Sequence, residues 1–281
     1  MAANKEIAQD TTKPPERRAL RIEKDAAVIR SMFAAISPRY DLLNHVLSLN
    51  IDRSWRRRTV RALRLDPSSR VLDVCTGTAD LAFELAEAVD PLQGGQVIGG
   101  DFTEEMIRIA ARKRGERRLE SPGLCIADTM HLPFADGSFD AVTVAFGIRN
   151  VVSLEAGLEE MLRVLRPGGQ AAILEFTTPK LKVVRTLYQT YFHRVLPRVG
   201  AWLSGSSAGR SAYRYLPNSV SEFPKPDELS TQLKGCGFVD ANYESLTCGV
   251  ACLHLATKPV GRGRPSLASS GPRSAPENAP R

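Results

Sequence analysis

Short apolar runs and longer amphipathic stretches alternate through the middle of the chain. The apolar runs, bounded by turn residues, predict five strands near residues 70–75, 96–101, 123–127, 139–146 and 169–176. The amphipathic stretches between them predict helices near residues 79–89, 103–115 and 154–166. This alternation is typical of a parallel sheet with helices on both faces, so we expect an α/β fold.

The pattern changes after the fifth predicted strand. Residues 180–234 contain aromatic and Arg-rich helical segments, and two apolar strands near 237–246 and 249–257 then return to the sheet. The turn RPGGQ at residues 166–170 predicts a helix that Pro167 ends, followed by glycines that permit positive φ. Because ligands bind beyond the carboxyl ends of strands in open α/β sheets, we expect the insertion and the helices before residue 70 to form a lid.

The two ends of the chain differ from this body. Residues 1–20 and 259–281 are rich in Pro, Ser, Arg and small residues without any period that would bury a face, which predicts disordered tails around one domain at 21–258. The formal net charge is +7, but residues 31–257 are nearly neutral. We therefore expect no nucleic acid as a partner.

The cysteines and the hydropathy pattern indicate the cellular compartment and the classes of site to expect. Five cysteines form no even framework, and no long apolar segment follows the charged N-terminus, so we expect a reducing, cytoplasmic environment. Cys248, Cys252 and His254 lack a second ligand pair, so no metal is expected there. No run of 18 uncharged apolar residues is present that would predict a membrane span.

The strongest chemical signal is VLDVCTGTADL at residues 71–81. An apolar strand leads through Asp73 into a turn with Gly77, from which a helix begins. One glycine instead of three disfavours a dinucleotide, and Asp73 suits a cofactor with an ammonium and a sulfonium group, such as S-adenosylmethionine. The second strand, QVIGGD, ends in Asp101, a position from which a carboxylate accepts both hydroxyls of a ribose.

Four stretches carry a resemblance to a known family: YDLLNHVLSLNIDRSW from residue 40, VLDVCTGTADL from 71, AFGIRNV from 145 and RVLRPGGQAAILEF from 163. Over roughly residues 28–258 the chain resembles the quinone-biosynthesis C-methyltransferases, which act on demethylmenaquinol or on a polyprenyl methoxy-benzoquinol. YRYLPNSV at 213–220 is similar to the family's segment after its inserted helices. The resemblance implies a Rossmann-like class I S-adenosylmethionine-dependent fold, with a seven-stranded, mostly parallel sheet that ends in an antiparallel pair.

The resemblance also implies site residues. It places cofactor contacts on Thr78 in the turn, Asp101 at the ribose, and Asp128 with Thr129 beside the adenine. Ala79 stands where the family usually has a third glycine, and we expect a negative φ there, with the helix beginning at once.

The proposed chemistry needs alignment of carbon, methyl and sulfur and stabilisation of a phenolate. Arg149 and Asn150 directly follow the fourth strand, where a guanidinium would hold the oxyanion and an amide would orient the ring. With a pKa above about 12, an arginine is not the proton acceptor, which leaves an ordered water or a nearby carboxylate. Alternative interpretations are a salt bridge for Arg149 and a helix N-cap for Asn150.

Four residues are expected at the acceptor pocket: Tyr40, Asp41, Asn44 and Tyr215. Packing and capping at a helix start is the alternative for the first three. The apolar and aromatic residues 183–203 either line the path of an isoprenoid tail or form ordinary helix contacts.

A basic segment precedes the first strand. Arg53, Arg57, Arg61 and Arg64 fall close to one helical face, with Trp55 nearby as a candidate aromatic anchor. Such a face is either a solvated surface or a peripheral contact with anionic headgroups on the inner side of a membrane.

We therefore predict a C-methyltransferase that converts demethylmenaquinol to menaquinol. The alternatives are the methoxy-benzoquinol of ubiquinone synthesis, RNA or another small molecule as acceptor, and a scaffold without activity. The sequence leaves the oligomeric state open.

Overall fold

A computed structural model describes residues 26–37, 48, 50–179, 182, 185, 186, 190, 215 and 219–260. Seven strands form one sheet, in the order β3-β2-β1-β4-β5-β7-β6. Their bounds are β1 Arg70–Val74, β2 Gln96–Asp101, β3 Gly123–Ile126, β4 Phe139–Ala145, β5 Leu165–Phe176, β6 Val239–Leu246 and β7 Ala251–Thr257. β1 to β5 pair in parallel, and β7 runs antiparallel to both β5 and β6. The predicted seven-stranded sheet is confirmed.

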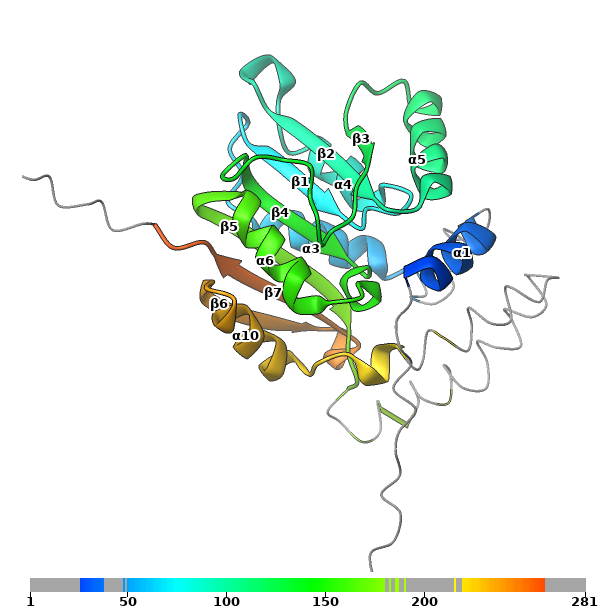
Figure 1. The fold of residues 1–281 in the computed structure, drawn as a ribbon, viewed down its shortest axis with the longest axis vertical. Coiled ribbons are helices and arrows are strands. Elements are labelled where there is room, and N and C mark those ends of the chain that lie inside the picture. The colour runs from blue at the N-terminus through cyan, green and yellow to red at the C-terminus, as the bar shows by residue number, and fades with distance from the viewer. Residues whose placement is uncertain are drawn as a thin grey trace, which may run out of the picture.

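The helices lie on both faces of this sheet. The longer ones in the described parts are α1 Ala26–Ile36, α3 Asp52–Ala62, α4 Asp80–Ala86, α5 Glu104–Glu116, α6 Leu154–Val164 and α10 Pro226–Gly235. In Figure 1, α6 and α10 lie in front of the sheet, and α3 and α4 lie behind it. The two faces bury separate apolar clusters, one centred on Phe83 and Leu85 of α4 and the other on Leu158 and Met161 of α6.

The segments after β4 differ slightly from expectation. α6 ends at Val164, and β5 already begins at Leu165, so the turn with Pro167 lies within the strand's bounds. Gly168 has the positive φ expected of the turn, +80°. α10, which the predicted insertion at 180–234 included, packs against β6 and forms part of the sheet's helical cover.

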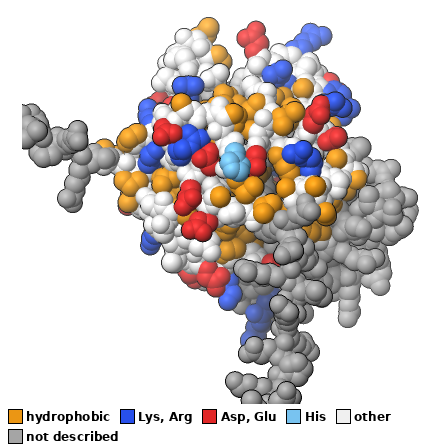
Figure 2. Space-filling model, in the orientation of Figure 1, with side chains coloured by type: hydrophobic (Ala, Val, Ile, Leu, Met, Phe, Trp, Pro, Cys, Tyr) orange, Lys and Arg blue, Asp and Glu red, His pale blue; other side chains and the backbone are white. Residues whose placement is uncertain are grey.

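The described surface carries both signs of charge. Figure 2 shows Lys and Arg side chains interspersed with Asp and Glu and with hydrophobic side chains on the viewed face, where neither sign dominates. Within the described ranges, no helix combines the length and the low charge that crossing a bilayer requires.

Candidate active site

The turn after β1 is organised by Asp73. Its carboxylate accepts hydrogen bonds from the hydroxyls of Thr76, at 2.6 Å, and Thr143 on β4, at 2.7 Å. Burial at 1% exposure raises the pKa of Asp73 to about 7, despite the two hydroxyl donors. The side chain therefore ties the turn to the neighbouring strand.

Ala79 shows where one expectation was wrong. Its φ is +67° and its ψ is 25°, so it occupies the left-handed region as the residue before α4 instead of taking a negative φ. Cys75 and Gly77 in the same turn also have positive φ, at 50° and 56°. A non-glycine residue in this region costs roughly 1 kcal/mol, and the packing around fully buried Ala79 maintains it there.

Asp101 joins the carboxyl ends of β1 and β2. One carboxylate oxygen accepts the amide of Gly77 at 2.9 Å, and the other accepts the amide of Thr103 at 2.8 Å. Burial raises the pKa of Asp101, and its 7% exposure leaves a small accessible surface toward the cavity that it lines. Each carboxylate oxygen has a further lone pair, so two ribose hydroxyls fit this position.

A cavity that is partly open to solvent lies beyond these strand ends. Four of the predicted cofactor residues line it together: Gly77, Asp101, Asp128 and Thr129. Thr129 contacts Cys75 Sγ through its hydroxyl, at 3.2 Å, and Asp128 accepts the amide of Met130 at 2.9 Å. The apolar lining comes from Ile29 and Phe33 of α1, and from Phe102, Met106 and Val151. An acid at one end and an apolar slot fit an adenosyl group.

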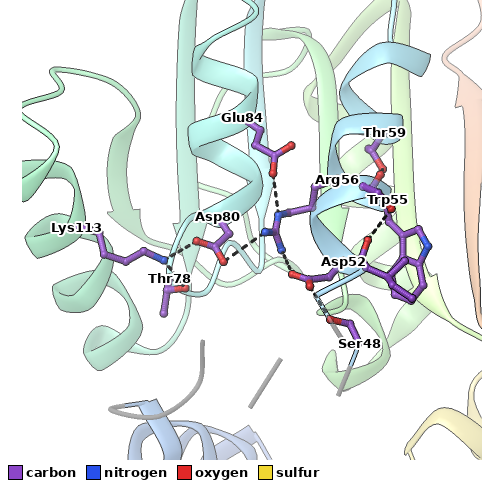
Figure 3. Close-up of polar contacts among 11 residues, drawn as sticks. Ser48, Asp52, Trp55, Arg56, Thr59, Thr78, Asp80, Glu84 and Lys113 are labelled. Atoms are coloured by element: carbon purple, nitrogen blue, oxygen red, sulfur yellow. Dashed lines mark hydrogen bonds and ion pairs between the residues drawn. The ribbon is translucent and has the colours of Figure 1, made fainter. Parts of the chain in front are cut away.

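Asp73 and Thr78 lie on a smaller neighbouring cavity, which Cys75 shares with the first. The hydroxyl of Thr78 accepts a hydrogen bond from Lys113 Nζ at 3.2 Å, and Lys113 also pairs with Asp80 at 2.5 Å. Figure 3 shows this lysine reaching from α5 to the start of α4. Thr78 is 2% exposed and thus belongs to the frame of the turn.

The two predicted catalytic residues lie in a short 3₁₀ helix, η3 (Ile148–Asn150), directly after β4. Arg149 is buried and donates from Nη1 to the carbonyl of Phe146 and to Glu175 Oε1, the latter at 2.6 Å. The salt bridge anticipated as an alternative is therefore present, and it joins η3 to the end of β5. A buried, oriented guanidinium at this edge also suits the stabilisation of an oxyanion.

Asn150 lines the large cavity and accepts a hydrogen bond from the Tyr215 hydroxyl at 3.1 Å. Burial raises the pKa of Tyr215, which therefore stays protonated as a donor at neutral pH. The fold thus brings Tyr215, 65 positions later in the sequence, to the pair that follows β4. Tyr40, Asp41 and Asn44 lie outside the described residues.

Glu175 is a site residue to which the sequence pattern assigned no role, although it lies in one of the family's motifs. The available signal was its position: an isolated acid at the carboxyl end of an apolar strand, as with Asp73 in β1 and Asp101 in β2. Burial raises the pKa of Glu175, and Arg149 opposes this shift.

Trp55 is not exposed, so its interpretation as a membrane anchor was wrong. It is 3% exposed, donates from Nε1 to Thr247 Oγ1 at 2.8 Å, and packs with Phe146 and Phe176 at ring-centroid distances of 6.0 Å. Phe176 also lies beneath the Arg149 guanidinium, 5.7 Å from ring centroid to Cζ. Trp55 therefore belongs to the buried aromatic cluster that packs beneath Arg149.

The family is decided by comparison over the whole domain. The model of the ubiE/COQ5 methyltransferase family matches residues 21–258. The chain belongs to this family. The predicted S-adenosylmethionine-dependent methyltransferase is thereby confirmed.

Individual relatives of this ubiE/COQ5 methyltransferase agree. The "Ubiquinone/menaquinone biosynthesis C-methyltransferase UbiE" of Geobacter sp. (strain M21) is 47% identical over 231 residues, which are 82% of this chain and 96% of the relative. The "Demethylmenaquinone methyltransferase" of Thermus thermophilus is 46% identical over 228 residues, which are 81% of this chain and 100% of the relative.

Solved structures show the same fold at lower identity. A SAM-dependent methyltransferase from Aquifex aeolicus has a TM-score of 0.53 at 18% identity. The superposed region covers 72% of this chain and 88% of the Aquifex chain. The [4+2]-cyclase SpnF has a TM-score of 0.62 at 17% identity, covering 83% and 96%. Since a cyclase shares the fold, the activity has to be argued from the site residues.

Proposed function

We propose that this chain transfers the methyl group of S-adenosylmethionine to a ring carbon of demethylmenaquinol, giving menaquinol. The observation that carries the proposal is the buried Arg149, fixed by Glu175 and adjacent to Asn150, which lines the cavity of the predicted cofactor residues and binds Tyr215. The names of the Geobacter and Thermus relatives support a polyprenylated quinol as the acceptor. The first relative's name also supports the methoxy-benzoquinol of ubiquinone synthesis as a second acceptor.

The chain's residues divide the work in two. Gly77, Asp101, Asp128 and Thr129 bind and orient the cofactor, which supplies an activated methyl group when bound. Arg149 stabilises the phenolate that forms when the quinol hydroxyl loses its proton, and Asn150 orients the ring. α1 contributes Ile29 and Phe33 to the cavity wall, which supports a lid that excludes water over the cofactor.

The test is transfer of labelled methyl from S-adenosylmethionine, in detergent, to reduced demethylmenaquinol and separately to the methoxy-benzoquinol. The oxidised quinones serve as controls because they lack the hydroxyl that activates the ring. We expect labelled product from demethylmenaquinol. Product from the benzoquinol alone would reassign the pathway, and no product from either, with saturable cofactor binding, would overturn the proposed acceptor class.

We further propose peripheral contact with anionic lipid through one groove behind the sheet. Exposed Arg53, Arg57 and Arg61 of α3 line it together with Arg117, the residue that follows α5. Basic side chains in the described lining outnumber acidic ones by six to three: Arg53, Arg56, Arg57, Arg61, Lys113 and Arg117 against Asp80, Glu84 and Glu87. A surplus of cations fits phosphate headgroups, and each cation adds about 1 kcal/mol near such a surface.

Sedimentation with phosphatidylglycerol vesicles tests this contact. Replacing Arg53, Arg57 and Arg61 together by Gln should lower partitioning about 100-fold at low salt, at roughly 1 kcal/mol per cation. The matched control replaces three exposed arginines outside the groove, Arg108, Arg112 and Arg118. Trp55→Phe should bind vesicles as the wild type does, because Trp55 is buried. Unchanged partitioning of the triple variant would overturn the contact.

A further inference from the structure

We propose that Glu175 is the carboxylate that accepts the proton of the quinol hydroxyl, with Oε2 as the accepting atom. The inference rests on the proposed function, and deepens it by assigning the proton acceptor. Glu175 is 1% exposed, at the carboxyl end of β5.

The two carboxylate oxygens of Glu175 have different surroundings. Oε1 accepts hydrogen bonds from Arg149 Nη1, at 2.6 Å, and from the amide of Phe176, at 2.8 Å. Oε2 is buried and accepts no well-formed hydrogen bond from the described residues, although the backbone amide of Arg149 also stabilises the carboxylate. A buried carboxylate oxygen without a donor carries a desolvation cost, which a donor from substrate would remove. This arrangement leaves one atom of a firmly held carboxylate available for a proton.

Glu175 also acts electrostatically on residues in both halves of the site. Its charge contributes to the raised pKa of Cys75, which lines the cofactor cavity, and to that of Tyr215, which is hydrogen-bonded to Asn150. The carboxylate is thus electrostatically coupled to Cys75 and Tyr215, and its ion pair with Arg149 holds it next to the residue that precedes Asn150. Burial raises the pKa of Glu175 itself, which makes it a better proton acceptor than an exposed carboxylate.

Arg149 makes the transfer feasible. A phenolic hydroxyl has a pKa near 10 in water, well above that of a carboxylate, so proton transfer between the two alone is unfavourable. The Arg149 guanidinium, fixed on Oε1, is placed to stabilise the resulting phenolate as well. The same ion pair thus orients the base and lowers the energy of the deprotonated substrate.

The proposed reaction begins at the quinol hydroxyl. Glu175 Oε2 takes the hydroxyl proton, and the electron pair of the O–H bond stays on the oxygen. The adjacent ring carbon then forms a bond to the cofactor's methyl group, whose sulfur keeps the electrons of the broken bond. Glu175 returns its proton to the oxygen while the hydrogen on the methylated carbon leaves to water as a proton, so one proton is released in total.

The test varies the acidity of the acceptor. Demethylnaphthoquinols with electron-withdrawing groups on the remote ring form the phenolate more readily, so they need the base less. For Glu175→Gln we expect kcat on the parent quinol to fall by about 100-fold or more, and the defect to shrink as the quinol becomes more acidic. Glu175→Asp keeps a carboxylate and should retain part of the activity. Its kcat should depend on the acidity of the quinol as weakly as that of the wild type.

Glu84 provides the matched control. It is also paired with a buried arginine, Arg56, and its Oε2 likewise lacks a partner among the described residues, but it lies on α4. Glu84→Gln should keep the wild type's weak dependence on quinol acidity. Cofactor titration of each variant verifies that the fold and the cofactor-binding residues are intact.

Two results would overturn the assignment. One is a Glu175→Gln variant that binds cofactor and loses the same factor on every quinol, as a purely structural role predicts. The other is a Glu175→Gln variant whose kcat on the parent quinol equals that of the wild type. Absence of methyl transfer by the wild type on all quinols would instead overturn the proposed function, and this inference with it.

Discussion

The Arg149 guanidinium donates to the Glu175 carboxylate across 2.6 Å, with both side chains at 6% exposure or less. This ion pair connects η3, the short helix that follows β4, to the end of β5. Its members depend on each other, because either one alone would be a buried, uncompensated charge.

Arg149→Ala should therefore affect stability as well as catalysis. Leaving Glu175 buried without its cation costs about 3–5 kcal/mol in the free energy of unfolding, and protonation of Glu175 recovers part of that cost at low pH. Turnover should fall while the dissociation constant for S-adenosylmethionine changes little, since Arg149 lies outside the cofactor lining. Chemical denaturation and cofactor titration measure the two effects. The added change Glu175→Gln should restore stability but not turnover, and a large loss of cofactor affinity in Arg149→Ala would contradict this division of roles.

Gly147→Ala should weaken cofactor binding. A Cβ at Gly147 would lie 2.4 Å from Cys75 Cβ, so the turn that lines both cavities would have to move. We expect at least about a tenfold rise in the dissociation constant for S-adenosylmethionine, from misplacement of the binding turn. Gly115→Ala is the control, since its Cβ would meet no atom within 4 Å in α5 and should stabilise the helix by up to about 1 kcal/mol. If Gly147→Ala and Gly115→Ala bind S-adenosylmethionine equally well, the close contact between a Cβ at Gly147 and Cys75 does not displace the binding turn.

Replacing the neighbouring residues Arg56 and Arg57 should change stability by very different amounts. Arg56 is buried and pairs with Asp52 at 2.6 Å and Glu84 at 3.2 Å, linking α3 to α4, as Figure 3 shows. Arg56→Ala should cost about 3–5 kcal/mol of unfolding free energy because Asp52, at 2% exposure, would lose its cation. The exposed Arg57 should change stability by less than about 0.5 kcal/mol on replacement by Ala. Urea denaturation of the two variants side by side decides the matter, and similar midpoints would refute it.

Asp73 should make the protein less stable as the pH rises toward neutrality. Its pKa is raised from 3.8 to about 7 in the folded protein, so between these values the unfolded chain releases a proton that the folded protein retains. This contribution to stability is present below about pH 4 and is lost progressively up to about pH 7. Asp73→Asn, which resembles the protonated acid, should flatten the fall in unfolding free energy between about pH 5 and pH 7. A slope identical to that of the wild type would show that other groups cause it.

The alternation of apolar and amphipathic segments determined the layers, the strands and the position of the glycine turn. These features follow from local periodicity, which the chain carries within each element. The same reasoning predicted that Asp101 and Asn150 lie at one edge of the sheet, where the carboxyl ends of parallel strands meet, and both line the cavity there.

Only the tertiary structure decided which side chains are buried and what they contact. Arg56 and Arg57 cannot be told apart by composition, yet one is enclosed by carboxylates from α3 and α4 and the other is exposed. Trp55 points into the aromatic cluster beneath the site, and packing holds Ala79 at a positive φ that its own side chain disfavours. The partnership of Arg149 with Glu175 and of Asn150 with Tyr215 joins positions 26 and 65 residues apart. Such contacts depend on the path of the folded chain, which local periodicity does not encode.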